Sequence, residues 1–262
     1  MPTPWDLDAI QVESTPLSTT GGHTWKAAYH LADFLAAVAT SQSPPPPPPN
    51  TSTTTTTPPP PLSHLLIAPD IRILELGSGC GWLGLTTAHN LPTASRIVLT
   101  EQEGGGACEW LAHNVLLHTS SSPRLKDRVH VVPCDWIEYS NSNASTPLPL
   151  TSERWDFIIG SDLIYNTVGS RLLPRVLRNL MHAETIVLYC HTKHRFDLLD
   201  MEFFDTLTKE CGLVCEEVWA GGGGGGGERV EGWEPPPPSP PLEFPPVDLF
   251  PEQRLAVYQI RM

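Results

Sequence analysis

The sequence from Ile73 to Leu85 is Ile-Leu-Glu-Leu-Gly-Ser-Gly-Cys-Gly-Trp-Leu-Gly-Leu. In this stretch an apolar run meets clustered glycines and then becomes amphipathic, which is typical of a β-strand that enters a tight loop and continues as a helix. Glycines let the backbone approach a ligand closely, and the first turn of the following helix presents unpaired N–H groups to it. The stretch therefore predicts a nucleotide-like cofactor at this loop.

Two kinds of cofactor are compatible with the loop. Gly79-x-Gly81-x-x-Gly84 matches the dinucleotide fingerprint, and Glu101 lies where the ribose-binding acid of that fingerprint is expected. The longer phrase at 75–81, Glu-Leu-Gly-Ser-Gly-Cys-Gly, has an acid inside the strand end and a glycine directly after the strand. This phrase resembles motif I of the seven-strand S-adenosylmethionine methyltransferases, and the resemblance favours S-adenosyl-L-methionine as the cofactor.

Strand and helix patterns alternate along most of the chain. We expect strands at 71–76, 96–100, 129–133, 155–160, 185–190, 213–218 and 256–260, and helices at 25–39, 82–90, 106–118, 168–182 and 201–211. Such alternation indicates a mostly parallel sheet that is covered on both faces. The predicted fold class is α/β, with a Rossmann-like seven-stranded sheet, helices on both faces and an antiparallel last strand.

Composition predicts one domain with insertions. The chain has 262 residues and is 40% hydrophobic, which suffices for one core, but many of its 29 prolines and 20 glycines lie in tracts that cannot join that core. We expect an N-terminal tail at 1–22 and a single domain at 23–262. Low-complexity insertions are expected at 41–61, 140–150 and 220–246.

The charge balance constrains the partners. A formal net charge of -13 argues against a partner that presents phosphates and suits one that presents lysine or arginine. No apolar run approaches the length of a membrane span, so no membrane partner is expected. The six cysteines form no CxxC pair, which favours a reducing compartment. We expect a monomer in the cytosol, with possible access to the nucleus.

Polar residues that follow the predicted strands are the candidate site residues. Glu101 ends the second strand, where a carboxylate can accept hydrogen bonds from both ribose hydroxyls. Asp135 and Trp136 follow the third strand, where they would lie near an adenine amino group and against its ring. For these two residues a helix-capping aspartate and a core tryptophan are equally open interpretations.

The segment from Ile158 to Tyr165 combines a buried strand with a polar Asp-x-x-Tyr step. Asp162 and Tyr165 are expected to face the crevice at the carboxyl end of this strand, where open α/β sheets bind their ligands. Asp162 as a plain helix cap is the alternative. Cys190, His191 and His194 lack a second pair with zinc-ligand spacing, so we predict no metal site.

Several motifs together resemble one family, the seven-β-strand protein-lysine methyltransferases of the methyltransferase-like group. They are Gly-His-Thr-Trp-Lys-Ala-Ala at 22–28, motif I, Asn-Val at 114–115 and Asp-Leu-Ile-Tyr at 162–165. The resemblance implies the following roles: Trp25 beside the cofactor, Gly77, Ser78 and Gly79 around its methionine part, Glu101 on the ribose, Trp136 at the adenine, Ser161 just before the catalytic step, and Asp162 and Tyr165 as catalytic residues. Lys26 and the Glu101-Gln102 pair depart from the family pattern.

The resemblance implies transfer of methyl groups to a lysine side chain of a protein, such as a translation elongation factor or a chaperone. Within the same class, methylation of arginine, histidine or a small molecule remains open, because loops that the sequence does not resolve form the acceptor pocket. Two other classes also remain open at this stage. They are an NAD(P)-dependent oxidoreductase and a catalytically inactive adaptor that uses its proline tracts for recruitment.

Overall fold

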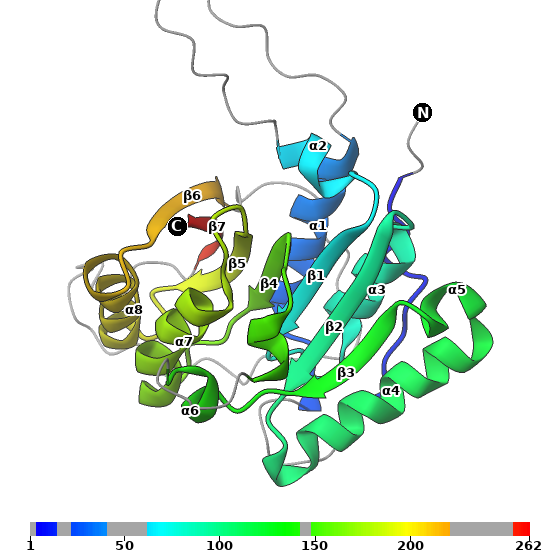
Figure 1. Ribbon diagram of the computed structural model, residues 1–262, viewed down its shortest axis with the longest axis horizontal. Helices are drawn as coiled ribbons and strands as arrows, with labels where there is room; N and C mark the ends of the chain where they lie inside the picture. The colour runs from blue at the N-terminus through cyan, green and yellow to red at the C-terminus, as the bar shows by residue number, and fades with distance from the viewer. Residues whose placement is uncertain (1–3, 15–21, 41–61, 142–147, 221–253) are drawn as a thin grey trace, which may run out of the picture.

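The computed structural model describes residues 4–14, 22–40, 62–141, 148–220 and 254–262. Its centre is a 7-stranded sheet in the order β3-β2-β1-β4-β5-β7-β6 (Figure 1). The strands are β1 (Ile71–Leu76), β2 (Ala94–Glu101), β3 (Val129–Pro133), β4 (Phe157–Ser161), β5 (Ile186–Lys193), β6 (Val214–Ala220) and β7 (Arg254–Arg261). Strand β7 pairs antiparallel with both β5 and β6, and the pairs among β1 to β5 are parallel. The predicted fold class is confirmed.

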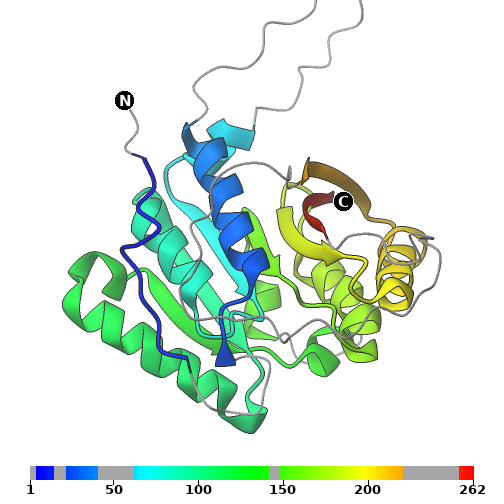
Figure 2. The same cartoon turned by 180° about the vertical axis from the view of Figure 1, so that it is seen from behind.

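Helices cover both faces of the sheet. They are α1 (Lys26–Thr40), α2 (Leu62–Leu66), α3 (Trp82–Asn90), α4 (Ala107–Ser121), α5 (Pro123–Lys126), α6 (Trp136–Tyr139), α7 (Thr167–Leu180) and α8 (Asp197–Asp205). The first four pack on one face (Figure 2), and α6, α7 and α8 pack on the other (Figure 1). The sheet has a hydrophobic core on each face, a first core beneath α1 to α4 and a second core beneath α6 to α8. Strand β1 contributes to both, because Ile73 packs in the first core and Leu74 in the second.

The bounds of the elements follow the predicted ones closely, with some differences. The short helices α2, α5 and α6 were not predicted, because they have five residues or fewer and therefore show little periodicity. Leu150 belongs to the surface insertion predicted at 140–150. Leu150 is instead fully buried in the second core, and its carbonyl accepts a hydrogen bond of 3.0 Å from Trp155 Nε1.

The N-terminal segment 4–14 has no regular secondary structure and lies against α3 and α4, as the dark blue tube in Figure 2 shows. Trp82 Nε1 donates to the carbonyl of Ile10 at 3.0 Å, and Ile10 itself is buried. The Asn114 amide donates to the Glu13 carbonyl at 3.1 Å and to the Cys80 carbonyl at 3.0 Å. This part of the predicted tail is therefore attached to the domain, and Asn114 connects it to the glycine-rich loop.

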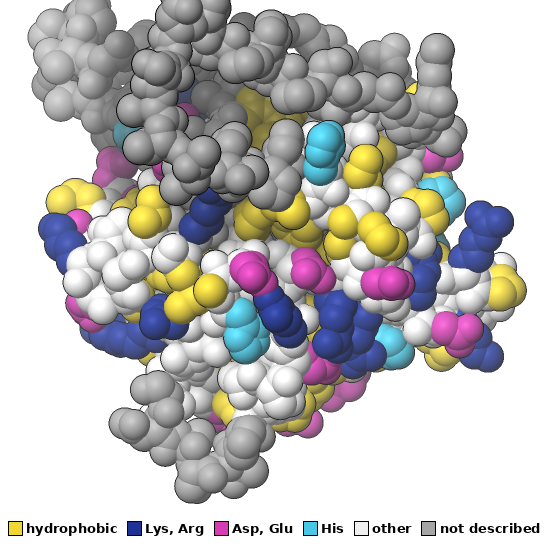
Figure 3. Space-filling view, turned by 45° about the horizontal axis from the view of Figure 1, so that its top comes forward, with side chains coloured by type: hydrophobic (Ala, Val, Ile, Leu, Met, Phe, Trp, Pro, Cys, Tyr) yellow, Lys and Arg dark blue, Asp and Glu magenta, His cyan; other side chains and the backbone are white. Residues whose placement is uncertain are grey.

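Acidic and basic side chains are interspersed on the face seen in Figure 3. At the amino-terminal edge of the sheet, Arg72 and Arg96 both pair with Glu153. Among the described residues, none of the helices combines the length and the apolar composition that a membrane crossing requires.

Candidate active site

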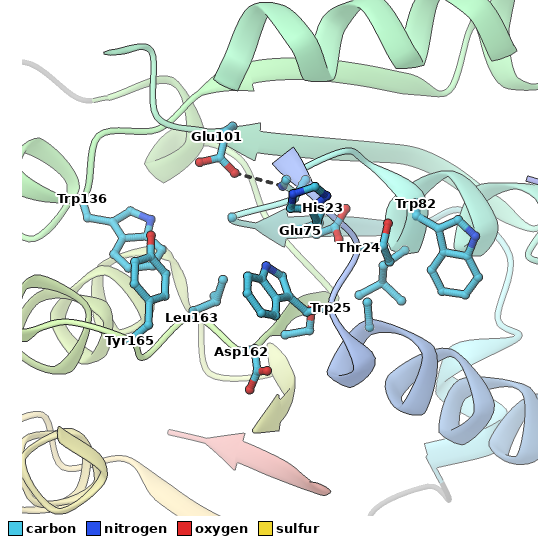
Figure 4. A pocket seen from close by; sticks show the side chains of 16 residues that line it. His23, Thr24, Trp25, Glu75, Trp82, Glu101, Trp136, Asp162, Leu163 and Tyr165 are labelled. Carbon is cyan, nitrogen blue, oxygen red and sulfur yellow. Dashed lines mark hydrogen bonds between the residues drawn. The ribbon is translucent and has the colours of Figure 1, made fainter. Parts of the chain in front are cut away.

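A cavity opens at the carboxyl ends of β1, β2 and β4, beside the start of α1 (Figure 4). It is lined by His23, Thr24, Trp25, Ala28, Glu75, Gly77, Ser78, Gly79, Trp82, Leu83, Glu101, Trp136, Ser161, Asp162, Leu163 and Tyr165. A second cavity shares Gly77, Glu101, Trp136 and Tyr165 with the first and adds Asp135. The structure therefore brings all of the sequence-predicted site residues to these two adjoining cavities.

The glycine-rich loop is held in place by the end of β2. Ser78 exchanges two hydrogen bonds with Thr100: its N–H donates to the Thr100 carbonyl at 2.8 Å, and its Oγ accepts from the Thr100 N–H at 3.1 Å. The Gly79 N–H donates to Glu101 Oε2 at 2.9 Å, which is the dashed line in Figure 4. The loop therefore has a fixed shape that side chains of the next strand define.

Glu101 has room for a further ligand. Its Oε1 accepts from the Gln102 N–H at 3.1 Å, and its Oε2 accepts from Gly79. A carboxylate offers about four lone-pair sites, so two remain for hydroxyl donors. Burial raises the pKa of Glu101, while the backbone N–H groups of Gly79 and Gln102 oppose that shift. This geometry suits a ribose diol, as the sequence analysis expected.

We expect Glu101→Gln to weaken the binding of S-adenosylhomocysteine about 10- to 100-fold, since hydrogen bonds to a charged group contribute about 1.5–3 kcal/mol each. Isothermal titration calorimetry measures the affinity directly. The exposed Glu103, which borders neither cavity, supplies a control, because Glu103→Gln neutralises a carboxylate without touching Glu101 and should leave the affinity within about twofold of the wild type. An unchanged affinity for Glu101→Gln would remove Glu101 from the cofactor site.

Asp135 and Trp136 lie in the second cavity, in which an adenine could be held. Asp135 Oδ1 accepts from the Ile137 N–H at 2.8 Å and thus caps α6, as the alternative interpretation stated. Trp136 is partly buried and borders both cavities, so it is not only a core residue. The capping role of Asp135 holds Trp136 at the first position of α6.

Asp162 has other partners than the sequence analysis anticipated. Its carboxylate accepts from the Thr192 N–H and the Thr192 hydroxyl, both at 2.9 Å, and pairs with Arg195 at 3.3 Å. The side chain is only 6% exposed, and in Figure 4 it points away from Glu101 and Trp136. Asp162 thus ties the segment after β4 to the end of β5, and its contact with an acceptor remains a prediction.

Arg195 joins this arrangement to the N-terminal side of the cavity. Its guanidinium lies 4.9 Å from the centre of the Trp25 ring and 5.3 Å from that of Phe196. Such distances are typical of cation–π contacts. Arg195 therefore links Trp25, which borders the cavity, to the carboxylate of Asp162. Nothing in the local sequence pattern indicated this link, since its three members are far apart in the chain.

Glu75 is a site residue that the sequence analysis noted in motif I but did not assign a role. Its side chain borders the first cavity, is almost completely buried, and has Oε2 without a hydrogen-bond partner. Burial raises the pKa of Glu75 to about 8. The Ser78 side chain and the Gly84 backbone oppose that shift, and the nearby Glu101 carboxylate adds to it. Its position as an acid inside an otherwise mostly apolar strand is the sequence feature that indicates a functional role for Glu75.

These residues fit a cationic nucleoside cofactor. The unpartnered oxygen of Glu75 and the carboxylate of Glu101 both favour a positive charge in the cavity, and Trp136 offers a ring surface for a base. Gly77 is required for the same fit, because a Cβ there would lie 2.5 Å from Leu163 Cδ2. Among the described residues, no cluster of three or more His, Cys, Asp or Glu side chains could hold a metal ion.

The sheet order and this cavity define an S-adenosylmethionine-dependent methyltransferase of the seven-strand class. The cofactor of this class is S-adenosylmethionine. The chain belongs to the lysine methyltransferase family, whose model matches residues 6–210.

A curated relative from Schizosaccharomyces pombe (strain 972 / ATCC 24843), described as UPF0665 family protein C23C4.06c, is 31% identical over 149 residues. The match covers 56% of this chain but only 41% of that relative. The chain thus matches less than half the length of this relative.

Several solved structures are similar to this chain at low sequence identity and with TM-scores below 0.5. P. horikoshii TYW2 in complex with MeSAdo is 15% identical with a TM-score of 0.42, over 76% of this chain and 60% of that chain. PigF with SAH is 15% identical with a TM-score of 0.45, over 73% and 50%. A SAM-dependent methyltransferase from Aquifex aeolicus is 11% identical with a TM-score of 0.44, over 77% and 87%.

Proposed function

We propose that this methyltransferase modifies the side chain of a lysine in a protein. The observation that carries the proposal is the open aromatic rim of the cofactor cavity. Trp25 and Tyr165 border the cavity and are nevertheless 38% and 41% exposed. A long side chain can therefore enter from outside while the rest of its protein stays on the surface. A small-molecule site would bury most of its ligand.

Two further features support a protein acceptor. The family to which the chain belongs is described by lysine methylation. The formal net charge of -13 favours a partner whose surface is basic, because oppositely charged surfaces associate faster and in preferred orientations. An acidic enzyme is also a poor match for the phosphates of a nucleic acid.

The chemistry divides between the cofactor and the chain. S-adenosylmethionine, when bound, supplies a methyl group on a positively charged sulfur. Gly77, Ser78 and Gly79 would hold it, and Glu101 would bind its ribose. A free lysine has a pKa of about 10.4, so its nitrogen must lose a proton to water or a nearby carboxylate before it can attack. Trp25 and Tyr165 then orient the neutral amine, and alignment provides most of the acceleration.

The proposal is tested with tritiated S-adenosylmethionine and a protein extract from cells that lack the gene. We expect label in a small number of protein bands, and acid hydrolysis should release it as methyl-lysine. Label in methyl-arginine or methyl-histidine would contradict the lysine assignment. Label confined to small molecules would contradict a protein acceptor, and binding of S-adenosylhomocysteine without any transfer would indicate an inactive adaptor.

Tyr165→Phe tests the acceptor side of the cavity separately from the cofactor side. We expect this variant to bind S-adenosylhomocysteine within about twofold of the wild type and to transfer methyl groups about tenfold more slowly, since a lost hydrogen bond contributes about 1–1.5 kcal/mol. Calorimetry gives the first quantity and label incorporation the second. Val168→Ala, at an exposed side chain of the second cavity, is a nearby control that removes no polar group. A Tyr165→Phe enzyme of full activity would exclude the hydroxyl from transfer.

A further inference from the structure

A line of buried polar groups lies behind the active-site segment that follows β4. The Leu163 N–H donates to the Tyr189 hydroxyl at 3.2 Å, and that hydroxyl lies 3.2 Å from His191 Nδ1. His191 Nε2 in turn lies 2.9 Å from Asp200 Oδ1 on α8, close enough for an ion pair although the two are not aligned for a hydrogen bond. Tyr189 and His191 come from the same face of β5, with ring centres 5.7 Å apart.

The Tyr189 hydroxyl has two hydrogen-bond neighbours, the Leu163 N–H and His191 Nδ1. It therefore connects the backbone of the active-site segment to the imidazole of β5. Burial raises the pKa of Tyr189 well above its usual value, so this hydroxyl keeps its proton.

These polar groups are unfavourable for packing alone. The His191 and Asp200 side chains are 2% and 13% exposed, and the ring centre of Phe204 lies 6.2 Å from that of His191. The ring centre of Phe203 lies 5.7 Å from that of Tyr189. Apolar residues of similar volume often replace a buried ion pair without loss of stability. The line also ends at a single backbone N–H in the wall of the active site. This end point suggests a role in geometry.

Leu163 transmits that geometry to the cofactor loop. Its side chain borders the first cavity and lies so close to Gly77 that a Cβ there would be 2.5 Å from Leu163 Cδ2. On its other side a Cβ at Gly160 would be 2.9 Å from Leu163 Cδ1. A shift of the Leu163 backbone would therefore displace one wall of the cavity between the cofactor loop and Tyr165.

We propose that Tyr189, His191 and Asp200 are positioning residues that hold Leu163, and with it the segment 161–165, in the arrangement that methyl transfer requires. The inference rests on the proposed function. It assigns His191 a role that replaces the metal ligation considered and set aside for Cys190, His191 and His194. None of the three positioning residues borders either cavity, so each acts through Leu163.

Tyr189→Phe removes only the hydroxyl and is the first test. We expect amide hydrogen exchange at Leu163 to become about tenfold faster, as the loss of one hydrogen bond implies. With labelled S-adenosylmethionine and the protein extract, the maximal rate of incorporation should fall about tenfold while the KM for the cofactor stays within twofold. A merely destabilising change would not separate these two quantities.

Tyr258→Phe is the matched control, because Tyr258 pairs directly with Tyr189 across β5 and β7 and packs on Phe204. It should change neither the Leu163 exchange nor the rate. Asp200→Asn removes the charge at the far end of the line, should show the same pattern to a smaller extent, and serves if Tyr189→Phe does not fold. Unchanged exchange at Leu163, or faster exchange with an unchanged maximal rate, overturns the proposal. A wild-type enzyme that labels nothing refutes the proposed function. In that case the exchange measurement still tests whether the Tyr189 hydroxyl holds the Leu163 backbone.

Discussion

Gly77→Ala is expected to weaken the binding of S-adenosylhomocysteine by about 100-fold or more. Gly77 has a φ of 58°, in which an alanine is disfavoured by about 1–2 kcal/mol. The new methyl group would also lie 2.5 Å from Leu163 Cδ2, and crowding of this kind costs a further ~1–3 kcal/mol. Leu163 cannot easily move aside, because its other methyl group lies against Gly160. The loop must relax in the free protein, and cofactor binding must then restore the strained shape.

Gly212→Ala separates the effect of the positive φ from the effect of crowding against a neighbouring side chain. Gly212 has a similar φ of 65°, but nothing lies within 4 Å of the position that its Cβ would take. This control should lower the melting temperature by a few degrees, given about 2–4 °C per kcal/mol for a domain of this size, and leave the cofactor affinity unchanged. Calorimetry with S-adenosylhomocysteine measures both variants. A Gly77→Ala protein of near wild-type affinity would mean that the cofactor does not need the observed shape of the loop.

Local sequence was enough to place the glycine-rich loop and the residues around it. The bounds of β1 and α3 were predicted correctly, because an apolar run, a glycine cluster and an amphipathic run follow one another without interruption at 71–90. Since the carboxyl ends of parallel strands lie at one edge, Glu101 and Trp136 could be placed near that loop as soon as a parallel sheet was expected. The two adjoining cavities bring these residues together.

Long-range side-chain contacts could not be predicted in the same way. The direction of the Asp162 carboxylate depends on Thr192 and Arg195, which follow it by about thirty residues and meet it only through the pairing of β4 with β5. A residue with φ of 52° at Asp162 is also not apparent from a pattern of apolar residues. The sequence analysis could therefore name Asp162 as a site residue but not its partners.

The N-terminal segment shows a second limit of local patterns. Its attachment uses the backbone carbonyls of Ile10 and Glu13, which every sequence possesses, and the donors are the side chains of Trp82 and Asn114 on distant helices. Composition alone suggested a tail, because the side chains that donate these hydrogen bonds are not in the segment itself. The motif residue Asn114 thus has a structural reason, since it fastens both this segment and the glycine-rich loop.

Glu75→Gln is expected to stabilise the cofactor-free protein at pH 8 but not at pH 4.5. In the folded protein the pKa of Glu75 is about 8, and in the unfolded chain it returns to about 4.5. Between these values the folded state holds a proton that the unfolded state has released, so the stability of the wild type falls as the pH rises through this window. Below it both states are protonated, and above it the full loss has been reached.

The isosteric glutamine has no proton to lose, so its stability lacks this dependence on pH. Each unit of pKa shift corresponds to about 1.4 kcal/mol, and the difference in melting temperature at pH 8 should therefore be about 5 °C or more. Glu103→Gln, which alters an exposed carboxylate of the same region, should keep the wild-type profile. If Glu75→Gln and the wild type differ by the same amount at both pH values, Glu75 does not titrate in this window.

Binding of the cofactor should displace the proton that Glu75 holds in the folded protein. A positive charge in the cavity favours the ionised form of Glu75, so the wild type is expected to release protons on binding S-adenosylmethionine at pH 7, whereas Glu75→Gln should release none. Calorimetry in two buffers with different heats of ionisation counts the protons directly. Equal release by both proteins would show that another group responds to the cofactor. Loss of release in the variant would assign to Glu75 the negative charge that the cavity presents to the sulfonium.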